Sequence, residues 1–218
     1  MQGYRERARV NLLPLSAEQS RLDLAIKEWR YEGKCRALEP RSGTCELCEQ
    51  KELSYHFEII NPGTRKTLNV GSECIKTFMV PVVDEGGHRL SQADADLKVD
   101  RDRRELEERV RHARVKRLLG QIVAAADSDK WKQFFEGILG RYIERKKLTP
   151  KEALPVLKRA KSLGLPFSPQ DISIELRRDK SKSDLGGLDD WELRILWKCL
   201  RPDQRSKLSE YQRRAEAD

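Results

Sequence analysis

Residues 45–78, CELCEQKELSYHFEIINPGTRKTLNVGSECIKTF, decide the fold of this chain. Cys45 and Cys48 are separated by two residues, a spacing at which two thiolates can hold one tetrahedral ion while the chain turns around it. Cys74 follows at the expected start of a helix, where free backbone N–H groups stabilise a thiolate. We expect these three cysteines to bind one structural zinc ion.

A β-hairpin is predicted between the two cysteine segments. In residues 53–60, LSYHFEII, the side chains alternate as in a strand, and KTLNV (66–70) alternates again after the turn residues 61–64. With this turn, Phe57 would lie near Leu68. A cysteine knuckle, a hairpin, and a helix with a ligand in its first turn follow one another in the order of a treble-clef zinc finger.

The sequence leaves the fourth zinc ligand open. Thr77 stands three residues after Cys74, where a treble clef usually has its second helix ligand, and no Cys or His lies within 75–87. His56, on the polar face of the first hairpin strand, and Cys35, in a loop-like region, are the candidates. A water molecule or a three-ligand site is the remaining alternative. We favour His56 as the fourth ligand. The alternative is that His56 is a solvated strand residue that binds no metal.

Several short stretches carry a family resemblance. The order EWxYxG, CxLC, YHFEI-N and VGSxCI-F, within residues 27–78, resembles a family of bacterial proteins for which no activity is established. Further similarity runs through LTPKEALPVL (148–157) and ISIELRRDKSKSDL (172–185) to LWKCLRPDQR (196–205), so it covers most of the chain. The resemblance implies the zinc module and brings no activity with it.

Helices are expected outside this module. A capping-box signature at 16–19 predicts a helix over about 17–32. In 91–126 the apolar positions change face near 111–114, so this helix either breaks there or packs its two halves on different neighbours. Further helices are predicted at 129–146, from Thr149 to Gly164, from Ser168, and over 189–210, where Pro202 divides two short helices.

These patterns together predict a mainly α-helical chain with a small β-hairpin zinc module. The fold class is α+β, with a treble-clef-like zinc finger embedded among helices and strands confined largely to 53–70. Two domains are expected. Residues 1–90 would hold an N-terminal helix and the zinc-binding hairpin, and residues 91–218 would form a charged helical domain.

The composition restricts the class of protein. The chain has 218 residues, of which 37% are charged, and its five cysteines include one CxxC pair, which favours metal binding over disulfides. The sequence contains no run of 18 apolar residues, so no transmembrane helix is predicted. The N-terminal MQGYRERARVNLLPLS lacks the apolar region of a signal peptide. We expect a cytoplasmic protein that does not bind membranes.

A net charge of +8 suggests a polyanionic partner. Residues 45–90 carry a charge of −2 and residues 91–218 a charge of +7, so nucleic acid, DNA or RNA, should bind the helical region rather than the zinc module. Phosphate contacts are expected from two clusters of basic residues. A solvated face is the alternative, because acidic residues are interleaved with the basic ones. The clusters are Arg109, Arg114, Lys116 and Arg117, and Arg177, Arg178, Lys180 and Lys182.

Two other functions compete with nucleic-acid binding. A protein–protein adaptor could present Trp131, Trp191 or Trp197 as an aromatic anchor, although tryptophans at helical spacing are more often core. An HNH-like nuclease would use His56 as general base, but cysteine ligands close the metal site and no other catalytic motif is present. We expect a non-enzymatic protein with no catalytic residue and no evident small-molecule substrate.

Overall fold

The computed structural model describes residues 2–39, 41–176, 184–208 and 211. The chain forms two compact units, Met1–Arg109 and Val110–Asp218, each with its own apolar core. The boundary lies inside helix α4 (Gln92–Ala124), whereas the sequence patterns predicted it at residue 90. The first turns of α4 belong to the N-terminal unit because Ala95 and Val99 are buried in its core.

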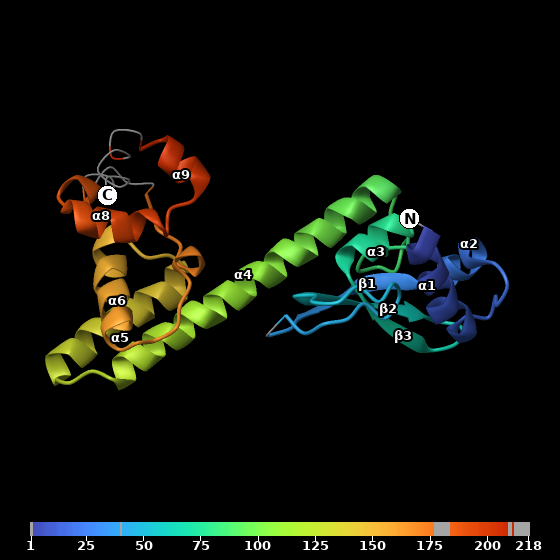
Figure 1. The fold of residues 1–218 in the computed structure, drawn as a ribbon, viewed down its shortest axis with the longest axis horizontal. Coiled ribbons are helices and arrows are strands. Elements are labelled where there is room, and N and C mark those ends of the chain that lie inside the picture. The colour runs from blue at the N-terminus through green and yellow to red at the C-terminus, as the bar shows by residue number, and fades with distance from the viewer. Residues whose placement is uncertain (1, 40, 177–183, 209–210, 212–218) are drawn as a thin grey trace. The chain divides into compact units, whose positions relative to one another are not determined.

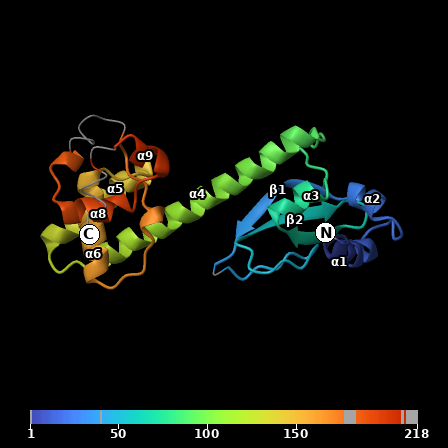
Figure 2. The ribbon, with the colours of Figure 1, turned by 45° about the horizontal axis from the view of Figure 1, so that its top comes forward.

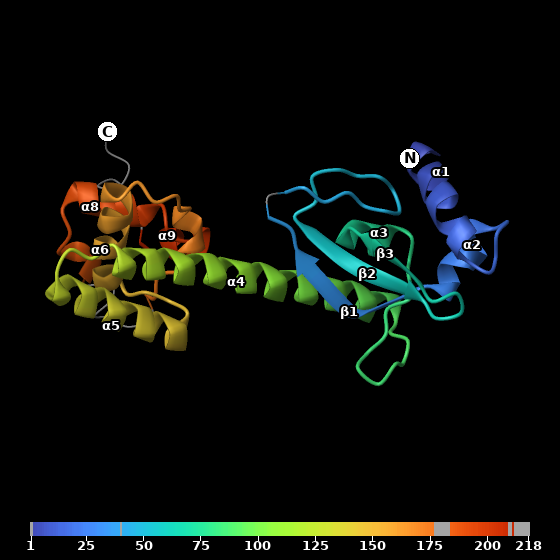
Figure 3. The ribbon, with the colours of Figure 1, turned by 90° about the horizontal axis from the view of Figure 1, so that it is seen from below.

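The N-terminal unit combines short helices with one sheet (Figure 1). The sheet has three antiparallel strands in the order β1-β2-β3, and Figure 3 shows α3 lying against it. The elements before α4 are α1 (Gln2–Leu12), η1 (Leu13–Leu15), α2 (Leu22–Ala25), η2 (Ile26–Glu28), β1 (Arg30–Ala37), β2 (Tyr55–Asn61), β3 (Lys66–Val70) and α3 (Ser72–Thr77).

The helix predicted over 17–32 is wrong in extent and in its start. Only 22–28 are helical, and β1 (Arg30–Ala37) is a strand outside the range in which strands were predicted. Ser16 does not cap a helix. Its hydroxyl donates to the carbonyl oxygen of Leu12 (2.9 Å) and accepts from the buried indole Nε1 of Trp29 (2.8 Å), so it uses its hydrogen bonds in the core.

The predicted hairpin is present, but its register differs by two residues. Phe57 pairs with Val70 rather than with Leu68, and Ile59 pairs with Leu68. The cause is Asn61, which stays in strand β2 while its side-chain oxygen accepts hydrogen bonds from the amides of Gly63 (2.9 Å) and Thr64 (3.1 Å). The Asn61 side chain therefore stabilises a turn that lies one residue further along the chain than predicted.

The C-terminal unit is helical, as predicted. Figure 2 shows α5, α6 and α8 gathered at the C-terminal half of α4. Pro202 separates the last two helices as expected, and in the described part of this unit the only strand-like pairing is an isolated bridge between Leu148 and Ile174. The elements are α5 (Asp129–Arg145), α6 (Pro150–Ser162), η3 (Pro169–Asp171), α8 (Asp190–Trp197) and α9 (Pro202–Ser206).

Helix α4 is continuous over 33 residues. Its apolar positions change face because its two halves pack on different cores: Ala95 and Val99 are buried in the first, and Leu118 and Ile122 in the second. This confirms the second of the two alternatives drawn from the sequence. None of the helices in the described part of the chain combines the length and apolar character needed to cross a bilayer.

Candidate metal centre

Three cysteine side chains meet in the interior of the N-terminal unit. The Sγ atom of Cys74 lies 3.5 Å from that of Cys45 and 3.2 Å from that of Cys48. All three residues are free thiols and at most 2% exposed. Among the described residues, this is the one group of three or more His, Cys, Asp or Glu side chains close enough to hold a metal ion.

The knuckle around Cys45 and Cys48 is held by backbone hydrogen bonds. The amide of Cys45 donates to Gln50 (2.8 Å), and the amide of Glu49 donates back to Cys45 (2.8 Å), which closes the turn. Glu46 ties the knuckle to strand β3, since its amide donates to the carbonyl oxygen of Asn69 (2.9 Å) and its carboxylate accepts from the amide of Asn69 (2.5 Å). The hairpin therefore fixes where the two thiols point.

The environment of the three sulfurs favours a thiolate. A hydrogen bond from the Cys74 thiol lowers the pKa of Cys45 to about 5, with further help from the backbone amides of Gly71, Cys48 and Leu47 against the opposing effect of burial. Sharing its proton with Cys45 raises the pKa of Cys74, and burial acts in the same direction. A thiolate is the form of cysteine that binds metals, so the lowered pKa of Cys45 suits a metal ligand.

Helix α1 covers the knuckle from one side. Tyr4 forms a side-chain hydrogen bond with Cys48, which is the largest cause of the raised pKa of Tyr4. Arg7 Nε donates to the carbonyl oxygen of Cys48 (2.7 Å), and Asn11 Nδ2 donates to that of Leu47 (3.2 Å). The three side chains are spaced so that they share one helix face. They were not predicted from the sequence, because no metal-ligand motif includes them.

A pocket of about 710 Å³ opens beside the sulfurs. Tyr4, Arg41, Arg103 and Glu107 are among the residues that line it. The charged residues of its lining are two arginines, Arg41 and Arg103, and three glutamates, Glu52, Glu73 and Glu107. The pocket therefore has no excess of cations over carboxylates.

The two candidates for the fourth ligand lie outside the group of three cysteines. His56 is buried on β2, its Nε2 is 3.0 Å from the carbonyl oxygen of Thr44, and its Nδ1 has no hydrogen-bond partner. Cys35 lies on β1 opposite Phe57 and is half-buried, and burial raises the pKa of its thiol. The structure therefore brings Cys45, Cys48 and Cys74 together. The role of His56 as the fourth ligand stays a prediction.

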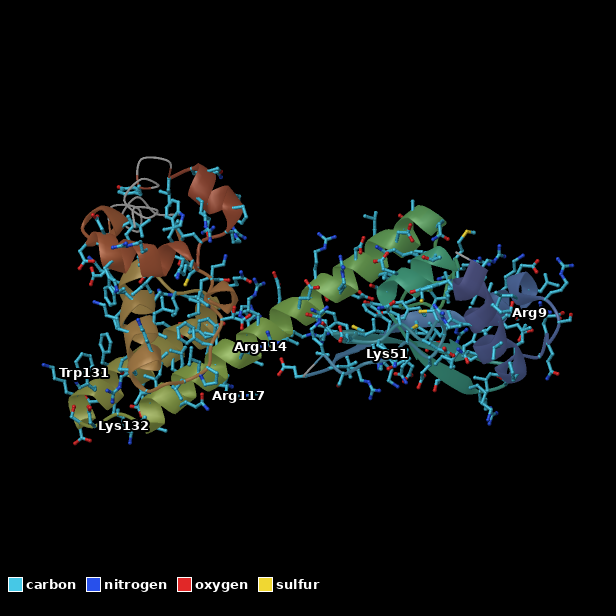
Figure 4. The ribbon with its side chains drawn as sticks, in the orientation of Figure 1. Arg9, Lys51, Arg114, Arg117, Trp131 and Lys132 are labelled. Carbon is cyan, nitrogen blue, oxygen red and sulfur yellow. The ribbon has the colours of Figure 1, made fainter. Side chains whose placement is uncertain are left out.

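The first predicted cluster of basic residues lies on the surface of α4. Arg109, Arg114, Lys116 and Arg117 are all exposed, and Arg114 and Arg117 are labelled in Figure 4. Arg114 forms an ion pair with Asp171 (3.6 Å), whereas Lys116 and Arg117 have no ion-pair partner in the described part of the chain. The second cluster, Arg177, Arg178, Lys180 and Lys182, falls outside the described residues.

The three tryptophans considered as anchors differ in burial. Trp131 is 50% exposed and Trp191 is 46% exposed, whereas Trp197 belongs to the core of the C-terminal unit.

Comparison of the chain with protein-family models, with curated proteins and with solved structures gave no match.

Proposed function

We propose that Cys45, Cys48 and Cys74 hold one structural zinc ion in a treble-clef-like finger. The observation that carries this proposal is the convergence of three buried sulfurs from the knuckle and from the first turn of α3. Thiolates are soft ligands, and a closed sulfur-rich site is typical of structural zinc. Elemental analysis of fresh protein tests it: about one zinc per chain is expected, and metal-free protein would refute it.

His56 is the proposed fourth ligand. If its Nε2–H donates to the Thr44 carbonyl, the lone pair of Nδ1 is left free, and this is how metal-binding histidines are usually oriented by a second hydrogen bond. X-ray absorption then has a clear expectation. Three sulfurs at about 2.3 Å and one nitrogen at about 2.0 Å support His56, whereas four sulfurs would move the assignment to Cys35.

The second part of the proposal is that the chain binds nucleic acid, DNA or RNA, through phosphate contacts of its helical region. The exposed Lys116 and Arg117, without ion-pair partners among the described residues, support it, as does the charge of +7 over 91–218. Fluorescence anisotropy with labelled single- and double-stranded DNA and RNA across a salt series tests it. A steep loss of affinity with salt is expected, and no binding at low salt would reject it.

The proposed role is non-enzymatic and includes no catalytic residue. In an HNH-like nuclease, His56 would have to reach a water molecule at an open metal site. It is instead 8% exposed and engaged with Thr44, which speaks against that role.

A protein–protein adaptor is the alternative function, and one observation favours it. Trp131 and Phe134 stand exposed at the start of α5 and pack edge to face, with ring centroids 5.6 Å apart. Aromatic side chains of this kind are frequent anchors in protein interfaces. If no nucleic acid binds at low salt, the adaptor becomes the first choice.

A further inference from the structure

The N-terminal unit has a second large hollow, separate from the cysteines. It has a volume of about 860 Å³ and lies between α1, the segment 22–27, the end of α3 and the start of α4. We call it the α1–α3 groove. Its lining includes the apolar side chains of Tyr4, Leu22, Ile26, Phe78 and Met79, and the cations Arg5, Arg7, Lys27 and Arg89.

The floor of the groove is apolar and partly preformed. The rings of Tyr4 and Phe78 are nearly parallel, with an interplanar angle of 8° and centroids 6.4 Å apart, so α1 and the end of α3 meet there. Arg7, which also holds the carbonyl oxygen of Cys48, lies over the Tyr4 ring with its guanidinium carbon 5.4 Å from the centroid. One wall of the groove is therefore fixed to the cysteine knuckle.

Met79 occupies an unusual position in this groove. Its amide donates to Lys76 (3.1 Å) and the amide of Val80 donates to Ile75 (2.9 Å), the hydrogen-bond pattern that ends many helices with a glycine. Met79 accordingly has a φ of 53°, in the left-handed region that favours glycine, and yet its side chain is 57% exposed. The chain thus keeps a flexible apolar side chain at a strained position that faces solvent, which points to a contact surface.

Most of the charged residues at the groove are cations that form no ion pair with a described residue. Arg5, Lys27 and Arg89 are exposed and form no ion pair with any residue that the structure describes. The single carboxylate of the lining, Asp23, is already paired with Arg21 (2.8 Å). An apolar floor with a rim of free cations is complementary to an apolar stripe flanked by carboxylates.

We propose that the α1–α3 groove binds an acidic amphipathic helix of a partner protein. Such a helix would place apolar side chains at i, i+3, i+4 and i+7 against Met79, Phe78 and Ile26. Its acidic side chains would pair with Arg5, Lys27 and Arg89. A nucleic acid would use the same cations, but it would not need the apolar floor, so titrations with the two ligands tell them apart.

The chain has two methionines, Met1 and Met79, so the methyl signal of Met79 reports directly on the groove. The zinc-loaded full chain, labelled with ¹³C at the methionine methyls, is titrated with a synthetic helical peptide of about four turns that carries a Leu stripe and Glu elsewhere. We expect a saturable shift of the Met79 signal, which a Met79→Leu change assigns. Peptides with Lys in place of Glu, or with Ser in place of Leu, should bind at least about tenfold more weakly.

Matched substitutions then test each half of the groove. Changing Arg5, Lys27 and Arg89 to Gln should weaken peptide binding about tenfold. The control changes Arg9, Lys51 and Arg65 to Gln, which removes the same charge from exposed positions outside the groove lining and should leave binding nearly unchanged (Figure 4 labels Arg9 and Lys51).

Met79→Gly relaxes the backbone and removes the side chain, so the fold should persist while affinity falls. Because this variant lacks the Met79 signal, its affinity is measured by the fluorescence anisotropy of a labelled peptide. Lys146→Gly, at the left-handed end of α5, is its control and should leave peptide binding unchanged. The proposal is overturned if the Met79 signal does not move with the Leu/Glu peptide, or if both triple variants bind equally. It is also overturned if a single-stranded oligonucleotide shifts the Met79 signal at lower concentration than the peptide does.

Discussion

Arg7 of helix α1 donates its Nε–H to the backbone carbonyl of Cys48 over 2.7 Å, a contact between residues 41 positions apart. Asn11 makes a similar contact with Leu47 one residue earlier in the knuckle. The orientation of the two CxxC thiols thus depends on a helix that contributes no cysteine. Groups of this kind, which orient ligands without binding the metal, commonly affect metal affinity.

Arg7→Ala should therefore weaken zinc binding by about tenfold, because the knuckle loses a hydrogen bond that orients Cys48. Competition with a chromogenic chelator measures the affinity. Arg9→Ala is the matched control: Arg9 lies two residues further along α1, is exposed, and makes no contact with the knuckle that the structure records. If both variants bind zinc as tightly as the parent does, the α1 contact does not tune the site.

Cys48→Ser should abolish stoichiometric zinc binding, because a serine hydroxyl stays protonated at neutral pH and is a poor zinc ligand. Cys45→Ser and Cys74→Ser should behave alike. Cys35→Ser is the control from the same unit, and full zinc content in that variant is expected if His56 is the fourth ligand. Elemental analysis of the purified variants decides the question, and a Cys48→Ser protein with a full equivalent of zinc would contradict the site.

Glu152 should give the C-terminal unit a pH-dependent contribution to stability. Burial opposes ionisation, but hydrogen bonds from Thr149 and the ion pair with Arg141 (2.5 Å) lower the pKa of Glu152 below its usual value of 4.5. Because the folded-state pKa is the lower one, this stabilisation is present above pH 4.5 and is lost as the pH falls through the folded-state pKa.

Glu152→Gln keeps the cap hydrogen bonds and removes the charge, so it should cost up to about 1 kcal/mol of unfolding free energy at pH 7, the size of a single ion pair, and nothing at low pH. Denaturant unfolding of both proteins between pH 7 and pH 3 measures the difference. Glu136→Gln, an exposed position on α5, should show no such trend. A difference that stays constant with pH would mean that the charge of Glu152 is not responsible.

Changing Arg114, Lys116 and Arg117 to Gln should weaken nucleic-acid binding and flatten its salt dependence, by up to about 0.9 in slope for each phosphate that is no longer neutralised. The Arg9, Lys51 and Arg65 triple variant removes the same charge and should keep the parent slope. Anisotropy titrations across the salt series compare the two. Equal effects of both triples would show that only net charge matters.

The same assay tests the basic cluster that lies outside the described residues. Changing Arg177, Arg178, Lys180 and Lys182 together to Gln should reduce affinity with little loss of folding, because this polar stretch carries no apolar residue. Unchanged binding would exclude the cluster as a contact surface.

The cysteine group was predictable because its signal is local: the CxxC spacing and a third cysteine at the start of a helix suffice. The cap of α6 was predictable for the same reason, and Thr149 and Glu152 form the capping box that their spacing indicates. The shift of the apolar positions from one face of α4 to another was also visible in the sequence. Its cause, the packing of the two halves of the helix on different cores, is visible only in the structure.

Strand β1 was not predicted because its alternation is interrupted. Gly33 has a φ of 93° and sits at a register shift between Tyr31 and Cys35, so polar and apolar positions fall out of step.

Helix α1 was not predicted because Ala8 and Leu12 are its only fully buried side chains among those described, too few to give a helical stripe. The position of His56 depends on a hydrogen bond to Thr44, which no pattern of residue types encodes.

The two separate cores have a consequence for how the chain loses its structure. Each core is built from its own segment, and the cysteine group belongs to the one formed by residues 8–99. Unfolding should then not be a single cooperative event, since two domains with independent cores seldom melt together. Chelation of the proposed zinc ion should destabilise the N-terminal domain alone, and the chain would then populate a half-folded species in which the helical domain persists.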